Sequence, residues 1–167
     1  MDRNNVLKVL VKVPRRGGLQ NEAEHAISVK NVIPTILKNI NVLSFDVNFA
    51  QDLAVIHDIK EIELETDIIK MIMLSCSPSL LQGLDVLSRR EGEKSEEHFN
   101  RVLSSDSLEV LAVKMADNLI NAKYTVAEQQ WHNSHFSYSY KRDRIKYLKR
   151  VGMIKERIMD LQIQMYG

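Results

Sequence analysis

Residues 52–61 read Asp-Leu-Ala-Val-Ile-His-Asp-Ile-Lys-Glu, an apolar run that ends in three side chains able to bind or activate through lone pairs. If this stretch is helical, Glu61 lies four residues after His57 and three after Asp58, so the three side chains share one face. Polar groups beside an apolar run are costly to desolvate unless something pairs with them. A divalent metal could be the group that pairs with them. A His-Asp pair is nevertheless too short a motif to be specific on its own.

Composition predicts one soluble domain. The chain has 167 residues, of which 44% are hydrophobic. This length suffices for one well-filled hydrophobic core but not for two, so we expect a single domain over residues 1–167. A net charge of +1 gives no overall attraction to nucleic acid or to an anionic membrane. The single Cys76 excludes an internal disulfide and a cysteine-based zinc site. With no apolar run of about 18 residues, we expect a cytoplasmic protein without membrane contact.

Few helix breakers interrupt the chain, which has three Pro and six Gly, so the pattern predicts an all-α fold. Residues 3–13 fit a helix or a strand, with the helix favoured. Residues 14–18 form a turn that carries Arg15 and Arg16. Asn21 and Glu24 predict a capping box for the next helix, which Pro34 should kink or divide.

Two polar residues lie on helix faces that are predicted to be buried, and the role of each has two interpretations. His25 begins an apolar stripe, where a histidine is more often a satisfied core residue than a ligand. Asp117 lies on a helix predicted for residues 107–125, which is apolar almost all round. An unpaired carboxylate there would be costly, so Asp117 either pairs with a cation such as Lys114 or binds a ligand.

A basic stretch with interleaved tyrosines, residues 141–150, is the one local concentration of positive charge. It could bind nucleic acid, since cations neutralise phosphates and tyrosines stack on bases. It could equally be the exposed face of the last helix, which is the commoner situation. We therefore expect no nucleic-acid partner.

The order of these motifs is more specific than any one of them: a histidine on a helix, then His-Asp-x-x-Glu, then an aspartate on a late buried helix. Such a nitrogen and oxygen donor set suits manganese, iron or a similar divalent ion. Over residues 15–150 the sequence resembles the HD-domain metal phosphohydrolases, and among them the hydrolase domain of RelA/SpoT-type alarmone enzymes and its small stand-alone relatives. Residues 113–121 match most closely, resembling the family's Lys-x-Ala-Asp-x-x-x-Asn helix.

This resemblance implies a single-domain helical bundle of the HD type that binds a divalent metal, with Mn²⁺ as the expected ion. The implied metal ligands are His25, His57, Asp58 and Asp117. Glu61 would orient the attacking water or take its proton. Substrate contacts would come from Arg15 or Arg16 at the base, Asn121 at the sugar or phosphate, and Arg144 at the distal phosphates.

The reaction implied is attack of an activated water on phosphorus of a nucleotide's 3′ substituent, so the expected substrate is guanosine 3′,5′-bis(diphosphate), which would lose its 3′-pyrophosphate. One departure from the family is Ile62, where active hydrolases carry an Asp after the Glu. Alternatives are therefore an HD nucleotidase acting on NADPH or a nucleoside monophosphate, a catalytically impaired HD-fold regulatory or binding protein, and a helical nucleic-acid binder. The sequence leaves the oligomeric state open.

Overall fold

The computed structural model describes residues 1–15, 19–131 and 137–167, and all regular structure in these ranges is helical. The helices are α1 (Arg3–Leu10), α2 (Glu22–Asn39), α3 (Val47–Ile56), α4 (Thr66–Leu74), α5 (Pro78–Leu87), α6 (Ser95–Leu103), α7 (Leu108–Trp131) and α8 (Ser137–Tyr166). The prediction of an all-α fold is confirmed. In the ranges described, no helix combines the length and apolar character needed to cross a membrane.

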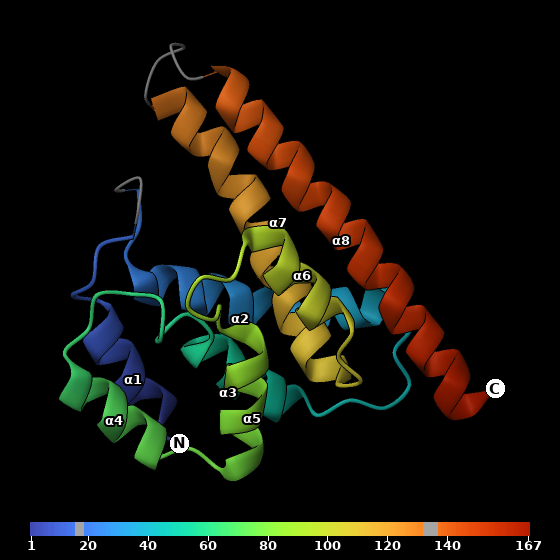
Figure 1. Ribbon diagram of the computed structural model, residues 1–167, viewed down its shortest axis with the longest axis horizontal. Coiled ribbons are helices and arrows are strands. Elements are labelled where there is room, and N and C mark those ends of the chain that lie inside the picture. The colour runs from blue at the N-terminus through green and yellow to red at the C-terminus, as the bar shows by residue number, and fades with distance from the viewer. Residues whose placement is uncertain (16–18, 132–136) are drawn as a thin grey trace.

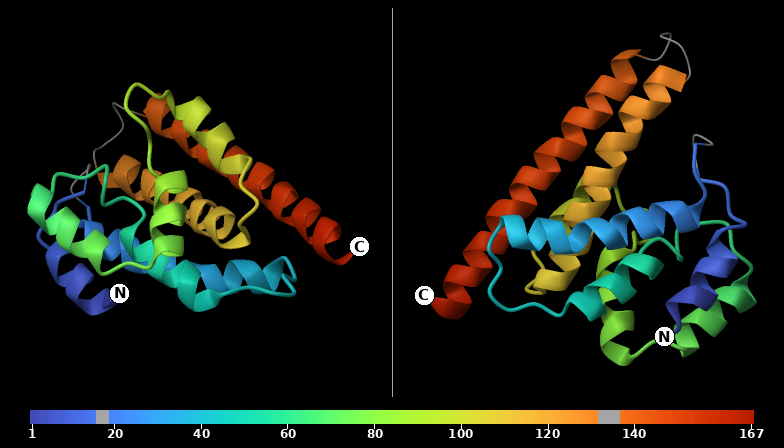
Figure 2. Two further views of the ribbon diagram at one scale, coloured as in Figure 1. Left: turned by 60° about the horizontal axis from the view of Figure 1, so that its bottom comes forward. Right: turned by 180° about the vertical axis from the view of Figure 1, so that it is seen from behind.

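The longest helices, α7 and α8, run antiparallel, and the C-terminal end of α7 and the N-terminal end of α8 project beyond the other helices (Figure 1). The opposite half of α7 packs against α2 and α3, and α1 and α5 pack around α3. Seen from behind, α2 crosses this pair of helices (Figure 2). Three segments far apart in the sequence, α2, the end of α3 and the middle of α7, therefore meet at one place.

The centre of the core lies on α7, as its apolar sequence predicts. Leu111, Ala112, Val113 and Ala116 have no exposed surface, and the two alanines leave room for neighbouring helices to approach closely. Burial of this kind supplies most of the stability of a helical bundle, because isolated helices are marginal in water.

Two local predictions differ from the structure, one of them in part. The helix expected through residue 61 ends at Ile56, and residues 57–61 continue as tight turns in which Glu61 N–H donates to Asp58 C=O at 2.8 Å. Of the kink or division predicted at Pro34, the division does not occur, because α2 is continuous to Asn39. Pro34 is exposed, so water can bond the carbonyl of Lys30 that the proline leaves without a helical partner.

The core predicts a large difference between two Leu→Ala substitutions. Leu53 on α3 is fully buried, whereas Leu43 is 74% exposed. Leu53→Ala leaves a cavity and should lower the free energy of unfolding by about 2–5 kcal/mol. Leu43→Ala, the matched control, should change it by less than about 0.5 kcal/mol. Urea denaturation measures both, and equal losses would contradict this packing.

Candidate metal centre and adjoining cleft

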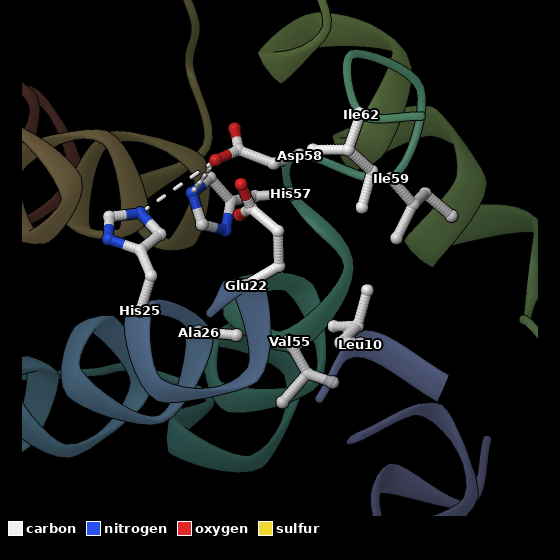
Figure 3. Close-up of a pocket in the computed structure, with 9 residues that line it drawn as sticks. All are labelled: Leu10, Glu22, His25, Ala26, Val55, His57, Asp58, Ile59 and Ile62. Atoms are coloured by element: carbon white, nitrogen blue, oxygen red, sulfur yellow. Dashed lines mark ion pairs between the residues drawn. The ribbon is translucent and has the colours of Figure 1, made fainter. Parts of the chain in front are cut away.

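Four side chains from three segments converge at one point. His25 comes from α2, His57 and Asp58 from the turn after α3, and Asp117 from α7. The Nε2 atom of His25 lies 3.7 Å from Asp58 Oδ2 and 3.4 Å from Asp117 Oδ1. The Nε2 atom of His57 lies 3.3 Å and 3.8 Å from the same two oxygens. Figure 3 shows both imidazoles directed toward the Asp58 carboxylate. The sequence-predicted ligand set is thus brought together.

The spacing of the donor atoms and the unpartnered imidazole nitrogens fit a small divalent cation. Ligands about 2.0–2.2 Å from a metal lie about 3.0–3.5 Å from one another, close to the distances found here. Donor atoms of His25, His57 and Asp58 all lie within 4.8 Å of one another. Within the described part of the chain, the Nε2 atoms of both histidines are buried without a hydrogen-bond partner. Buried polar atoms rarely remain unpaired, so the site fits a ligand that accepts lone pairs.

The orientation of His57 also suits a ligand role. Its Nδ1 lies 2.7 Å from the carbonyl oxygen of Ala54, which can only accept, so Nδ1 carries a proton and Nε2 is the nitrogen that faces the cluster. Burial disfavours a charged imidazole, but the carboxylates of Asp58 and Asp117 outweigh it and raise the pKa of His57 to about 10. Burial lowers the pKa of His25. The carboxylates therefore stabilise positive charge at this position.

Asp117 pairs with Lys114, as one interpretation of its sequence predicts, and its other oxygen faces the imidazoles. Its Oδ2 accepts a hydrogen bond from Lys114 Nζ at 3.1 Å, and its Oδ1 accepts one from Asn121 Nδ2 at 2.6 Å while facing the imidazoles. Burial alone would raise the pKa of this carboxyl, but Lys114 and the two imidazoles hold it well below its usual range. The Asp117 carboxylate is thus ionised and fixed in place.

Arg15 and Glu22 complete the surroundings of the centre. Arg15 Nη1 donates to Glu22 Oε2 at 2.8 Å and to Asp58 Oδ2 at 3.0 Å, and its Nη2 donates to Asn121 Oδ1 at 3.1 Å. Glu22 is buried, and burial raises its pKa. Sequence reasoning missed Glu22. Its position three residues before His25, on the same face of α2, was the available signal.

Apart from the imidazoles themselves, the ionised groups of the centre carry a net negative charge. Three carboxylates (Glu22, Asp58 and Asp117) face two cations (Arg15 and Lys114), a balance of −1. With neutral imidazoles, a divalent ion would turn this balance into +1. A centre of that charge would attract phosphate oxygens.

An open cleft of about 730 Å³ adjoins the centre, and both Asp58 and Asp117 line it. Positive side chains come from several elements: Arg15 before α2, Arg89 after α5, and Lys146 and Arg150 on α8. The cleft is large enough for a small phosphorylated ligand, since ligand pockets typically measure about 300–1,000 Å³.

The remaining predicted site residues are placed differently. Glu61 lines the cleft, is exposed, and accepts a hydrogen bond from Arg89 N–H at 2.9 Å. Asn121 lines the cleft next to Asp117. Arg144 is exposed on α8 outside the described lining of the cleft, where Lys146 and Arg150 of the same helix are found instead. Arg16 lies outside the described residues.

Comparison with protein-family models and with curated proteins found no match for this chain. The site's chemistry therefore has to be argued from its own geometry.

The pKa of His57 predicts how metal binding depends on pH. Because the imidazole holds a proton up to about pH 10, a metal that takes Nε2 must displace that proton. Affinity for Mn²⁺ or Zn²⁺ should then rise about tenfold per pH unit for each proton released, between about pH 6.5 and 8.5. Competition with a chelator of known affinity measures it. An affinity independent of pH in this range would contradict the assignment of His57 Nε2 as a ligand.

Proposed function

We propose that this protein is a metal-dependent phosphohydrolase that acts on a nucleotide, with guanosine 3′,5′-bis(diphosphate) as substrate and the 3′-pyrophosphate as the group released. The observation that carries the proposal is the convergence of four metal-ligating side chains beside a cleft lined by cations. The choice of substrate rests on the resemblance of residues 15–150 to the HD-domain alarmone hydrolases.

His25, His57, Asp58 and Asp117 would hold the ion, and Mn²⁺ is the ion we propose. When bound, it lowers the pKa of a coordinated water toward neutrality and neutralises charge on phosphoryl oxygens. Asp117 can keep its ligating geometry because Lys114 and Asn121 fix its carboxylate.

The chain's own polar groups would bind and orient the substrate. Arg15 lies beside Asp58 with its guanidinium spread between Glu22 and Asn121, so it can contact a phosphate placed at the centre. Lys146 and Arg150, farther along the cleft on α8, would bind the more distant phosphates in place of the role first expected of Arg144. Glu61 would orient the attacking water or accept its proton from the cleft side.

A second candidate function is nucleotide binding without turnover, as in a regulatory protein. One observation favours it: Ile62, half-buried, lines the cleft beside Asp58 where the family's second acidic residue is expected. An isoleucine can neither orient nor deprotonate water. In this alternative the metal and the substrate would still bind.

Metal analysis of the purified protein, combined with a screen for released phosphate and pyrophosphate, tests the proposal. The screen should include guanosine tetraphosphate, NADPH and nucleoside monophosphates, each with Mn²⁺ and with a chelator. We expect Mn²⁺-dependent release of pyrophosphate from guanosine tetraphosphate. Release from NADPH or a monophosphate would identify a different nucleotidase, and bound metal with nucleotide binding but no release would support the regulatory protein. Absence of bound metal would overturn both functions.

A further inference from the structure

A second group of polar side chains lies in the cleft at the point where α6 begins. α6 packs against both α7 and α8 (Figure 2). Ser95, the first residue of α6, lines the cleft together with Lys146 and Arg150 of α8. His98 also lines the cleft, one turn farther along the same face of α6. We name Ser95, His98, Lys146 and Arg150 the α6 cluster, and none of the four belongs to the metal centre.

Two side chains of the α6 cluster are buried and keep a nitrogen without a partner. His98 is 5% exposed and Arg150 is 8% exposed, although both line the cleft. Among the residues that the structure describes, neither His98 Nε2 nor Arg150 Nε has a hydrogen-bond partner. Buried polar atoms are nearly always hydrogen-bonded, so unpartnered nitrogens in the wall of an open cleft indicate a polar ligand.

Ser95 adds a hydroxyl that is free to donate. Its Oγ accepts hydrogen bonds from Lys146 Nζ at 3.2 Å and from Arg150 Nη2 at 3.1 Å. A hydroxyl oxygen has two lone pairs, and because both are used here, its remaining capacity is the O–H donor. The positive end of the α6 helix dipole lies at the same residue. The donors and charges at the start of α6 therefore favour an anion.

The carboxylate of Glu96 pairs with the two cations of the α6 cluster in the free protein. Its Oε1 accepts from Arg150 Nη2 at 2.8 Å and lies 3.5 Å from Lys146 Nζ. The Glu96 side chain is 65% exposed, so its carboxylate can turn into water while the buried Arg150 stays in place. A phosphate has more oxygens and a larger charge than a carboxylate, which makes it the stronger partner for these cations. Glu96 thus shows that an anion fits here and competes with an incoming one.

The surroundings of His98 are consistent with an anion at this position. Burial and the positive charge of Lys114 lower the pKa of His98. Arg101 acts in the same direction, whereas Glu61 and a hydrogen bond to the Leu87 backbone oppose it. The imidazole is therefore neutral at pH 7. A bound anion at Nε2 would stabilise the doubly protonated ring, in which both nitrogens donate.

We propose that the α6 cluster is a phosphate-binding site that needs no metal ion, and that Glu96 pairs with its cations until a phosphate displaces it. The inference deepens the proposed function and rests on it for one point, the choice of a nucleotide as the carrier of the phosphate. The reacting phosphate would lie at the metal centre, and a second phosphate of the same nucleotide would lie at the α6 cluster.

Titration of inorganic phosphate into the full chain, freed of metal with a chelating resin, tests the site. Nuclear magnetic resonance of the histidine side chains follows binding, and the signals of His98 should shift and saturate while those of His25 and His57 stay unchanged. Glu96→Gln should lower the dissociation constant for phosphate about two- to fivefold, because it removes an exposed ion pair that competes with the ligand. Glu91→Gln, which changes an exposed glutamate outside the α6 cluster, is the matched control and should leave the constant unaltered.

Two further variants test the donors. Lys146→Met and His98→Leu should each raise the dissociation constant at least about tenfold, because each removes a hydrogen bond to a charged group. Lys149→Met, at an exposed lysine of the same helix, should not change it. Urea denaturation checks that the variants are folded, and Lys146, which is only half-buried, keeps the test available if His98→Leu is unstable. The proposal is overturned if the signals of His98 do not respond to phosphate, or if binding is the same in Glu96→Gln, Lys146→Met and wild type.

Guanosine and guanosine 5′-monophosphate separate a nucleotide phosphate from free phosphate. We expect the monophosphate to bind the metal-free protein more tightly than inorganic phosphate, with the same response to Lys146→Met, and guanosine to leave the signals of His98 unshifted. Equal affinity for inorganic phosphate and the monophosphate would overturn the choice of a nucleotide. Phosphate binding at His98 without Mn²⁺-dependent turnover would retain this site and reject the proposed hydrolase, whereas turnover without phosphate binding at His98 would do the reverse.

Discussion

Asp117→Ala is expected to abolish divalent-ion binding at the candidate centre and any metal-dependent release of phosphate or pyrophosphate. The substitution removes one of the four converging ligands, whose Oδ1 lies 3.4 Å and 3.8 Å from the two imidazoles. Loss of groups that merely orient a ligand already costs about 10–100-fold in affinity or activity. Loss of a ligand should cost more than about 100-fold in metal affinity and leave no measurable turnover.

The same substitution should also destabilise the fold. Lys114 is largely buried and donates to Asp117, so Asp117→Ala leaves a buried cation without its counter-charge. Breaking one side of a buried ion pair costs about 3–5 kcal/mol. Metal affinity by chelator competition, product release and urea denaturation should therefore all change.

Two variants separate the loss of the ligand from the loss of stability. Asp117→Asn keeps the size of the side chain and an oxygen for Lys114, so it should retain more stability than Asp117→Ala while still losing tight metal binding. Asp143→Ala removes another carboxylate that lines the cleft but stands outside the cluster, and it should bind metal normally. Wild-type metal affinity in Asp117→Ala would show that this carboxylate serves only as the partner of Lys114.

Local signals predicted the parts of the fold that local chemistry controls. The capping box at the start of α2 is present in both halves, with Asn21 Oδ1 accepting from Glu24 N–H and Glu24 Oε2 accepting from Asn21 N–H. The nearly uniform apolarity of residues 107–125 correctly indicated a central helix, because only a helix surrounded by others needs no polar face. The burial of Asp117 followed from its position on that helix.

Contacts between distant segments could not be predicted in the same way. Arg15 reaches Asn121 across 106 positions of sequence, and no periodicity encodes that approach. Glu22 becomes part of the centre only because Arg15 bridges it to Asp58. The end of α3 at Ile56 was likewise missed, since nothing between residues 52 and 61 is a helix breaker. The turn there directs His57 and Asp58 toward His25. A helix that continued beyond Ile56 would carry these two side chains past His25.

Glu61→Gln is expected to leave metal binding intact and to slow turnover by about 10²–10⁴-fold, the range associated with loss of a general acid or base. Glu61 lines the cleft but is exposed, and its Oε1 accepts from the backbone N–H of Arg89. Glutamine keeps that oxygen and the length of the side chain, so the loop should stay in place. What it loses is the negative charge that would attract a proton.

A comparison with Glu63→Gln makes this test specific. Glu63 is an exposed glutamate two positions away, and its conversion should alter neither metal binding nor turnover. Measuring metal affinity and turnover separately then distinguishes the roles assigned to Asp117 and Glu61. Asp117→Ala should lose both metal binding and turnover, and Glu61→Gln should lose turnover alone. Equal loss of metal in the two variants would make Glu61 a ligand, which would require the loop after α5 to release it from Arg89 and bring its carboxylate to the imidazoles.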